Sequence, residues 1–286
     1  MRKLVILAII AIVSSCAVSK RENENSLFWQ ISGSGLEQPS YLFGTIHLMC
    51  PDDIQITEGM EIALKNSQRL VLELDFDEPG AIKAMQQAAI MTDGTTLNDL
   101  LSKEEYQLVR KYLQDSLSIP IQVVNTMKPM MLSMLMYMDV LNCQPGSYEM
   151  ALTQRAEALN IEVMGLETIE DQVRAFDFLP LEEQADYLVE AIKHYDKTVA
   201  EIESMLKAYQ MGQVNRLYAL THKSMQEMVE AEAILLNDRN QKWIPVIEKL
   251  VQEHATFFAV GAGHLGGPHG IIALLREQGY TLEVTN

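Results

Sequence analysis

The sequence lacks an apolar run long enough to cross a bilayer as a helix, which takes about 20 residues. It is also poor in positive charge, with 22 Lys and Arg residues against 39 Asp and Glu residues and a formal net charge of −17. The first absence excludes a membrane-spanning body. The second excludes nucleic-acid binding, which needs a basic face, and electrostatic docking on anionic lipid headgroups.

The N-terminus has the pattern of a bacterial lipoprotein precursor. Arg2 and Lys3 precede the short apolar run Leu4–Val13, as in a signal peptide. Small residues then lead directly into Cys16, which resembles the lipobox in which that cysteine is lipidated and becomes the mature N-terminus. We therefore predict a signal peptide over residues 1–15, a polar tether over residues 16–26, and an extracytoplasmic protein held by its lipid to a bacterial membrane, in the periplasm or at the outer membrane.

Cysteine is scarce, with three residues in the chain. If Cys16 carries a lipid, Cys50 and Cys143 remain in a compartment that permits disulfides. A Cys50–Cys143 bridge and two separate thiols both agree with the sequence, because sequence alone does not show whether two cysteines are close in space.

The remainder of the chain has the composition of a packed globular protein, with 48% hydrophobic and 21% charged residues. We predict a single domain over residues 27–286. Its fold class is predicted as α/β (α+β), with a mixed β-sheet assembled from the N- and C-terminal segments. The middle, about residues 79–255, is predicted to be a mostly helical insertion.

Local patterns predict the individual elements. Short β-branched and aromatic runs predict strands over 27–32, 41–48, 69–75, 161–166, 256–260 and 281–284, the first two paired as a hairpin. Helices are predicted over 57–67, 149–159 and 271–278, over 79–141 with a break near Pro120, and over 168–251 with breaks at Pro180, Gly212 and Pro245. A glycine-rich loop is predicted over 261–270.

Two of the predicted strands carry the same motif. Gly44-Thr-Ile-His47 and Gly261-Ala-Gly-His264 are both Gly-x-x-His. A glycine at a strand end frees the backbone for a tight turn that can project a histidine from the edge of a sheet. If the two strands are neighbours, the two histidines converge although they are far apart in sequence. Glu73 ends a third apolar strand, where a carboxylate is costly to bury without a cation or a donor.

Two histidines and a carboxylate at strand ends form a plausible ligand set for a divalent metal with open positions. A structural role for each histidine is the alternative that such a short motif leaves open. No His-Glu-x-x-His occurs in the chain, which excludes a zincin-type protease. The run Gly261–Gly266 also matches a dinucleotide fingerprint, but too little chain follows it for a nucleotide fold, so no such cofactor is predicted.

These motifs carry a resemblance to a known family. The paired Gly-x-x-His motifs, the acid after a buried strand, and the run Val260–Gly270 followed by Leu-Leu-Arg-Glu-Gln-Gly-Tyr resemble the TraB/GumN family (the TraB/PrgY/Tiki superfamily). That family includes the Tiki metalloproteases and bacterial pheromone-shutdown proteins. Gly165-Leu-Glu-Thr168 and Asp238-Arg-Asn240 ahead of Trp243 agree with it. The resemblance spans about residues 27–286.

The resemblance implies a membrane-tethered metalloprotease that hydrolyses peptides or unfolded protein segments with Mn²⁺ or Co²⁺, and Zn²⁺ is also compatible. His47 and His264 are expected to be metal ligands or immediate metal partners. Glu73 is expected to be a ligand or the base that activates water. Glu167 is a secondary candidate ligand. Arg239 is expected either to steady an oxyanion or a substrate carboxylate, or to form a salt bridge with a neighbouring acid.

The sequence leaves several alternatives open. Six methionines crowd one predicted helix and can fill a core or line a peptide groove: Met127, Met130, Met131, Met134, Met136 and Met138. His269 fits a surface position or a partner of the site. For the function, the alternatives are a non-catalytic protein that binds or sequesters peptides, as in pheromone shutdown, and a metal-dependent hydrolase of other substrates.

Overall fold

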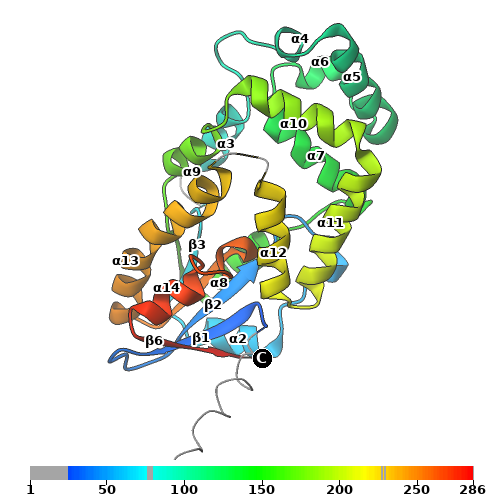
Figure 1. Ribbon diagram of the computed structural model, residues 1–286. Coiled ribbons are helices and arrows are strands. Elements are labelled where there is room, and N and C mark those ends of the chain that lie inside the picture. The colour runs from blue at the N-terminus through cyan, green and yellow to red at the C-terminus, as the bar shows by residue number, and fades with distance from the viewer. Residues whose placement is uncertain (1–24, 76–79, 227, 229, 286) are drawn as a thin grey trace, which may run out of the picture.

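The computed structural model describes residues 25–75, 80–226, 228 and 230–285 (Figure 1). The predicted signal peptide, Cys16 and the tether up to residue 24 lie outside these residues. Ser26, near the end of the predicted tether, accepts a hydrogen bond from Trp29 Nε1 at its carbonyl oxygen, 2.7 Å away. Within the described part of the chain, no helix combines the length and the apolar character needed to cross a bilayer.

Six strands form one mixed sheet in the order β4-β3-β5-β2-β1-β6. Their bounds are β1 Phe28–Gly33, β2 Ser40–Thr45, β3 Arg69–Leu72, β4 Glu162–Gly165, β5 Thr256–Gly261 and β6 Tyr280–Val284. β2, β3, β4 and β5 run parallel, whereas β1 is antiparallel to both β2 and β6. The α/β class, the β1–β2 hairpin and a sheet built from both ends of the chain are confirmed. Among its described residues, the middle of the chain supplies one strand of the sheet, the edge strand β4.

The central strands are apolar on both faces because helices cover both faces of the sheet. In β3 and β5, the runs Leu70–Leu72 and Phe257–Val260 are completely buried, as expected for parallel strands in the middle of a sheet. The right-handed crossovers place α2 (Glu58–Lys65) and α8 (Tyr148–Leu159) on one face and α13 (Asp238–Glu253) and α14 (Ile271–Glu277) on the other (Figure 1).

The rest of the middle region is mostly helical and extends beyond the carboxyl ends of the parallel strands, although Ala208, Tyr209, Val214 and Leu217 pack in the core of the sheet (Figure 1). Its helices are α3 Ala81–Ala88, α4 Leu97–Leu100, α5 Lys103–Leu117, α6 Ile121–Val124, α7 Pro129–Leu141, α9 Ile169–Phe176, α10 Leu181–Lys193, α11 Tyr195–Gln210 and α12 Val214–Met225. Helices α4, α5, α6, α7 and α10 share a hydrophobic core of their own, separate from that of the sheet. We call these five helices the helical lobe.

The helical middle is broken in more places than the sequence pattern predicts. Thr96 and Ser102 each form a capping box that starts a new helix within the stretch predicted as two helices. Breaks at Pro180 and Gly212 are confirmed, since α10 begins after Pro180 and Gly212 separates α11 from α12. The predicted break at Pro245 is wrong, because α13 continues through it. Burial of Trp243, with its neighbours on the same helix, offsets the roughly 3 kcal/mol that an internal proline costs.

The Cys50–Cys143 disulfide is formed, which settles the alternative that the sequence left open. It joins the loop after β2 to the segment after α7. Beside it, Met49 and Gly146 exchange two backbone hydrogen bonds, at 3.1 and 2.8 Å. Together these contacts hold the loop that carries His47 against the start of α8.

Replacing both Cys50 and Cys143 with serine is expected to lower the free energy of unfolding by about 2–4 kcal/mol. The bridge spans a sequence separation of 93 residues, so it removes many conformations from the unfolded chain. Denaturant titration of the oxidised protein and the double variant measures the difference. Reduced wild type should behave like the double variant, and equal stability of all three samples would contradict the expectation.

Candidate functional site

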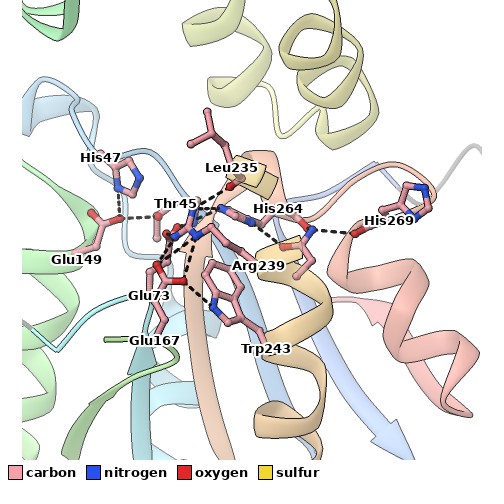
Figure 2. Close-up of polar contacts among 12 residues, drawn as sticks. Thr45, His47, Glu73, Glu149, Glu167, Leu235, Arg239, Trp243, His264 and His269 are labelled. Atoms are coloured by element: carbon pink, nitrogen blue, oxygen red, sulfur yellow. Dashed lines mark hydrogen bonds and ion pairs between the residues drawn. The ribbon is translucent and has the colours of Figure 1, made fainter. Parts of the chain in front are cut away.

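The two Gly-x-x-His motifs lie side by side because β2 and β5 are neighbouring parallel strands. Gly44 is paired with Val260, and Thr45 with Gly261. The other neighbour of β5 is β3, after which Glu73 follows. His47, Glu73 and His264 therefore meet at the edge where the parallel strands have their carboxyl ends, the usual ligand position of α/β folds (Figure 2). The expected convergence of the two histidines is confirmed.

Gly261 makes room for this meeting point. A Cβ atom at Gly261 would lie 3.0 Å from Glu73 Oε1 and 3.6 Å from both His47 Nε2 and His264 Cδ2. Its backbone N–H donates a hydrogen bond of 2.7 Å to Glu73 Oε1, and the same oxygen lies 3.8 Å from His264 Nε2. The motif glycine thus lets a carboxylate and two imidazoles share one small volume. We call His47, Glu73 and His264 the cluster.

Arg239, on α13, holds the buried part of the cluster together. Its Nε and Nη2 donate to Glu167, and Nη2 also donates to Glu73. Its Nη1 donates to the carbonyl oxygen of Leu235 and lies 3.1 Å from His264 Nε2. A guanidinium has five N–H groups, and these contacts use all of them. Of the two roles expected for Arg239, the structure shows the salt bridge and leaves no free N–H for an oxyanion.

Glu167, expected as a secondary metal ligand, forms a salt bridge with Arg239. It follows β4, and both of its oxygens accept hydrogen bonds, one of them also from Trp243 Nε1 at 3.2 Å. The Trp243 ring lies 4.7 Å from the Arg239 guanidinium carbon and 4.5 Å from the His264 ring. The two carboxylates and the guanidinium are largely buried, with side-chain exposures of 7–10%.

Asn240 fixes the orientation of the His264 ring. Its side-chain N–H₂ donates to the carbonyl oxygens of His264 and His269, which turns its oxygen toward His264 Nδ1 at 2.6 Å. Nδ1 therefore carries the proton, and the lone pair of Nε2 accepts a hydrogen bond from Arg239 Nη1. His269 itself is exposed and contributes only its backbone, so its predicted surface position is confirmed.

Glu149, on α8, is a site residue that the sequence analysis missed. Its Oε1 accepts a hydrogen bond from Thr45 at 2.7 Å and lies 3.0 Å from His47 Nδ1 (Figure 2). Its buried Oε2 has no hydrogen-bond partner. The only local signal is an acid in the first turn of a helix, which is ordinary at helix starts. The contact with His47 depends on how the loop after β2 is tied to α8.

At neutral pH His47 is protonated, whereas His264 is neutral. Burial would lower the pKa of His47, but the hydrogen bond with Glu149 and the charges of Glu73 and Glu149 raise it to about 9. The His47 side chain is 58% accessible and lines a cavity beside the cluster. Burial lowers the pKa of His264 to about 3, and the opposing charge of Glu73 does not compensate. Burial would also raise the pKa of Glu73, but the positive groups around it and the Gly261 N–H lower it to about 2.

The cluster has the donor chemistry of a divalent-metal site. In metal-binding histidines one ring nitrogen is held by a carboxylate or carbonyl group and the other faces the metal. His47 Nδ1 on Glu149 and His264 Nδ1 on Asn240 fit this pattern, with both Nε2 atoms on the side of Gly261. In the arrangement that the described residues adopt, no three His, Cys, Asp or Glu side chains form a ready metal site. Arg239 instead supplies the positive charge beside Glu73.

Fold and site together define an α/β protein with two histidines and a carboxylate at the carboxyl ends of three adjacent strands. Residues 27–284 match the TraB/PrgY/gumN family, and the chain belongs to that family. The resemblance drawn from the motifs is thereby confirmed.

The relatives of the chain include named metalloproteases. Metalloprotease TIKI1 of Xenopus tropicalis is 24% identical, over 93% of this chain and 63% of that protein. Metalloprotease TIKI1 of Homo sapiens is also 24% identical, over 94% of this chain and 64% of that protein. An uncharacterized protein of Treponema pallidum (strain Nichols) is 22% identical, over 96% of this chain and 90% of that protein. The chain thus spans less than two thirds of the Tiki proteins. No solved structure is significantly similar to it.

The substitution Arg239→Met is expected to lower the free energy of unfolding by about 3–5 kcal/mol, because it leaves Glu73 and Glu167 as buried carboxylates without a cation. Arg174→Met is the matched control. Arg174 forms a salt bridge with Asp171 but is 74% exposed, so its loss should cost at most about 1 kcal/mol. Urea denaturation followed by circular dichroism compares the two, and similar losses would contradict the assigned role.

Histidine-ring NMR of the metal-free protein is expected to show His47 titrating near pH 9 and His264 neutral throughout the neutral range. Because the pKa of His47 is raised on folding, its contribution to stability is present below pH 6.5 and is lost as the pH rises through about 9. Glu149→Gln should move the His47 titration down toward its ordinary range. An unchanged His47 titration in that variant would show that Glu149 is not the cause.

Proposed function

We propose that this protein is a metal-dependent peptidase that hydrolyses peptides or unfolded protein segments. One observation carries the proposal: the side chains of His47, Glu73 and His264 converge beside Gly261. Two imidazoles and a carboxylate are donors that suit a divalent metal, and the chain belongs to a family with metalloprotease members. In keeping with the Tiki resemblance we favour Mn²⁺ or Co²⁺, and imidazole donors are also compatible with Zn²⁺. When bound, such an ion lowers the pKa of a bound water and polarises a carbonyl group.

The charge states of the cluster divide the roles among its residues. A general base works best with a pKa near the working pH, and the pKa of Glu73 lies far below it. We therefore assign Glu73 the role of a metal ligand rather than that of the general base. His264 is already neutral, with a lone pair on Nε2. His47 is protonated in the metal-free protein, so it must release a proton before its Nε2 can act as a ligand, and Glu149 holds its ring in place.

We further propose that the enzyme works outside the cytoplasm, tethered to a membrane by a lipid on Cys16. The Cys50–Cys143 disulfide supports this location, since such bonds persist in oxidising compartments. The net charge of −17 makes attachment through anionic lipid headgroups unfavourable, which leaves the lipid as the anchor.

A second candidate is a protein that binds or sequesters peptides without cleaving them. It is favoured by Arg239, which already neutralises Glu73 and covers the Nε2 lone pair of His264. In that case the cluster stabilises the fold, and the cavity beside it binds the peptide.

A peptide-cleavage assay with added Mn²⁺ or Co²⁺ separates the two candidates. His47→Ala, Glu73→Gln and His264→Ala are each expected to lower cleavage by more than the roughly 10- to 100-fold typical of residues that only support metal ligands. His269→Ala is the control, because its exposed ring lies outside the cluster. A chelator should abolish cleavage, and elemental analysis should find a bound divalent ion.

Equal cleavage by wild type and the three cluster variants would overturn the peptidase assignment. So would cleavage that persists in the presence of chelator. Peptide binding without any cleavage would favour the sequestering protein.

A further inference from the structure

A cavity of about 610 Å³ lies directly beside the cluster, with His47, Glu73 and Glu149 forming one end of it. Its volume falls within the roughly 300–1,000 Å³ of typical ligand sites. The rest of its wall comes from helices α3, α7, α8, α9 and α10, so it lies between the sheet and the helical lobe. Any molecule that reaches the cluster through this cavity also contacts the wall.

Methionine dominates that wall. Met85, Met130, Met131, Met134 and Met150 contribute from three different helices. Methionine is unbranched and polarizable, so a surface built from it adapts to apolar groups of different shape. Met134 and Met150 are 42% and 63% exposed and line the same cavity, and contiguous exposed apolar surface of this kind is typical of ligand-binding grooves.

Helix α7 has one face that packs in the helical lobe and another face that lines the cavity. Leu132 and Met136 are buried in the core of the helical lobe. Met130, Met131 and Met134 lie on the other side and line the cavity. Both alternatives for this methionine-rich helix therefore apply, each to a different face. The cavity methionines are not needed for the core.

The charges around the cavity favour an uncharged apolar group. Besides the cluster and Glu149, the charged residues in its described wall are Lys128 and Asp177, which pair with each other. No unpaired cation is therefore present in the described wall to receive a carboxylate. An acidic side chain would meet Glu149 and the overall negative charge of the chain.

A second cavity of about 470 Å³ continues beyond the Lys128–Asp177 pair. The two cavities share Ala88, Lys128, Val173, Asp177 and Gln184 as lining residues, so they adjoin along one wall. Together the two adjoining cavities offer more volume than one side chain fills. This volume is compatible with a segment of polypeptide.

We propose that the methionine-lined cavity is a specificity pocket for a large apolar side chain, such as Leu, Met or Phe, of a polypeptide whose backbone passes the cluster. This inference rests on the proposed function, which it extends from peptides in general to peptides with an apolar residue beside the bond that is cleaved.

The test measures binding separately from cleavage. Fluorescently labelled Gly/Ser peptides that differ only in a central Leu, Met, Phe or Asp are titrated into the chelator-treated full chain in detergent, and anisotropy gives each Kd. The apolar peptides are expected to bind at least about 10-fold more tightly than the Asp peptide, the gain typical of burying one large apolar side chain. Met134→Asp should remove this preference.

Met138→Asp is the matched control, because Met138 lies on the same helix and is 38% exposed but does not line the cavity. It should keep the wild-type preference. Circular dichroism checks that both variants fold. If Met134→Asp does not fold, Met150→Asp replaces it, since Met150 lies at the cavity and is more exposed.

Two results would overturn the pocket: equal binding of all four peptides by wild type, or a preserved preference in the variant that carries Asp in the cavity. A parallel cleavage assay of the same peptides with Mn²⁺ separates this failure from a failure of the proposed function. Binding preference without cleavage supports the pocket and contradicts the peptidase. Cleavage without preference contradicts the pocket alone.

Discussion

The pairing of Arg239 with Glu73 and Glu167 is the interaction on which the site depends. The two carboxylates follow adjacent strands and are both buried, which is unfavourable without a cation. The guanidinium comes from α13 on one face of the sheet and reaches over the carboxyl ends of β3, β4 and β5. It thereby fixes Glu73, which Gly261 and His264 contact from the other side.

The two Gly-x-x-His motifs show that a shared motif does not set the state of its histidine. His264 is buried, faces an amide oxygen and stays neutral, whereas His47 faces a carboxylate at the edge of a cavity and is protonated. The environment makes the difference, because a neighbouring carboxylate or loss of water shifts an imidazole across neutral pH in opposite directions. The cluster thus combines a neutral imidazole, whose Nε2 accepts from Arg239, with a protonated one, whose Nδ1 donates to Glu149.

The helical middle adds a cavity to the edge of the sheet. The disulfide and the Met49–Gly146 bridge tie the His47 loop to the segment between α7 and α8. As a result the helix that lines the cavity with methionines and the helix that supplies Glu149 are positioned by the same contacts. The same contacts therefore position both the polar end of the cavity and its apolar wall.

Local sequence patterns were sufficient to predict the strands and the hairpin, because residue preference and alternation act over a few neighbouring positions. The motifs at the strand ends carried the resemblance to the family. Local patterns did not reveal that β2 and β5 are adjacent, that Glu149 holds His47, or that Cys50 and Cys143 are bonded. They also placed a break at Pro245, where burial of the surrounding helix outweighs the cost of the proline. Those features depend on contacts between segments far apart in the chain, which only the packed sheet and its crossovers bring together. The sequence by itself therefore determined that two histidines and Glu73 stand at strand ends, and the tertiary structure decided their partners, their protonation states and the cavity that His47 and Glu73 face.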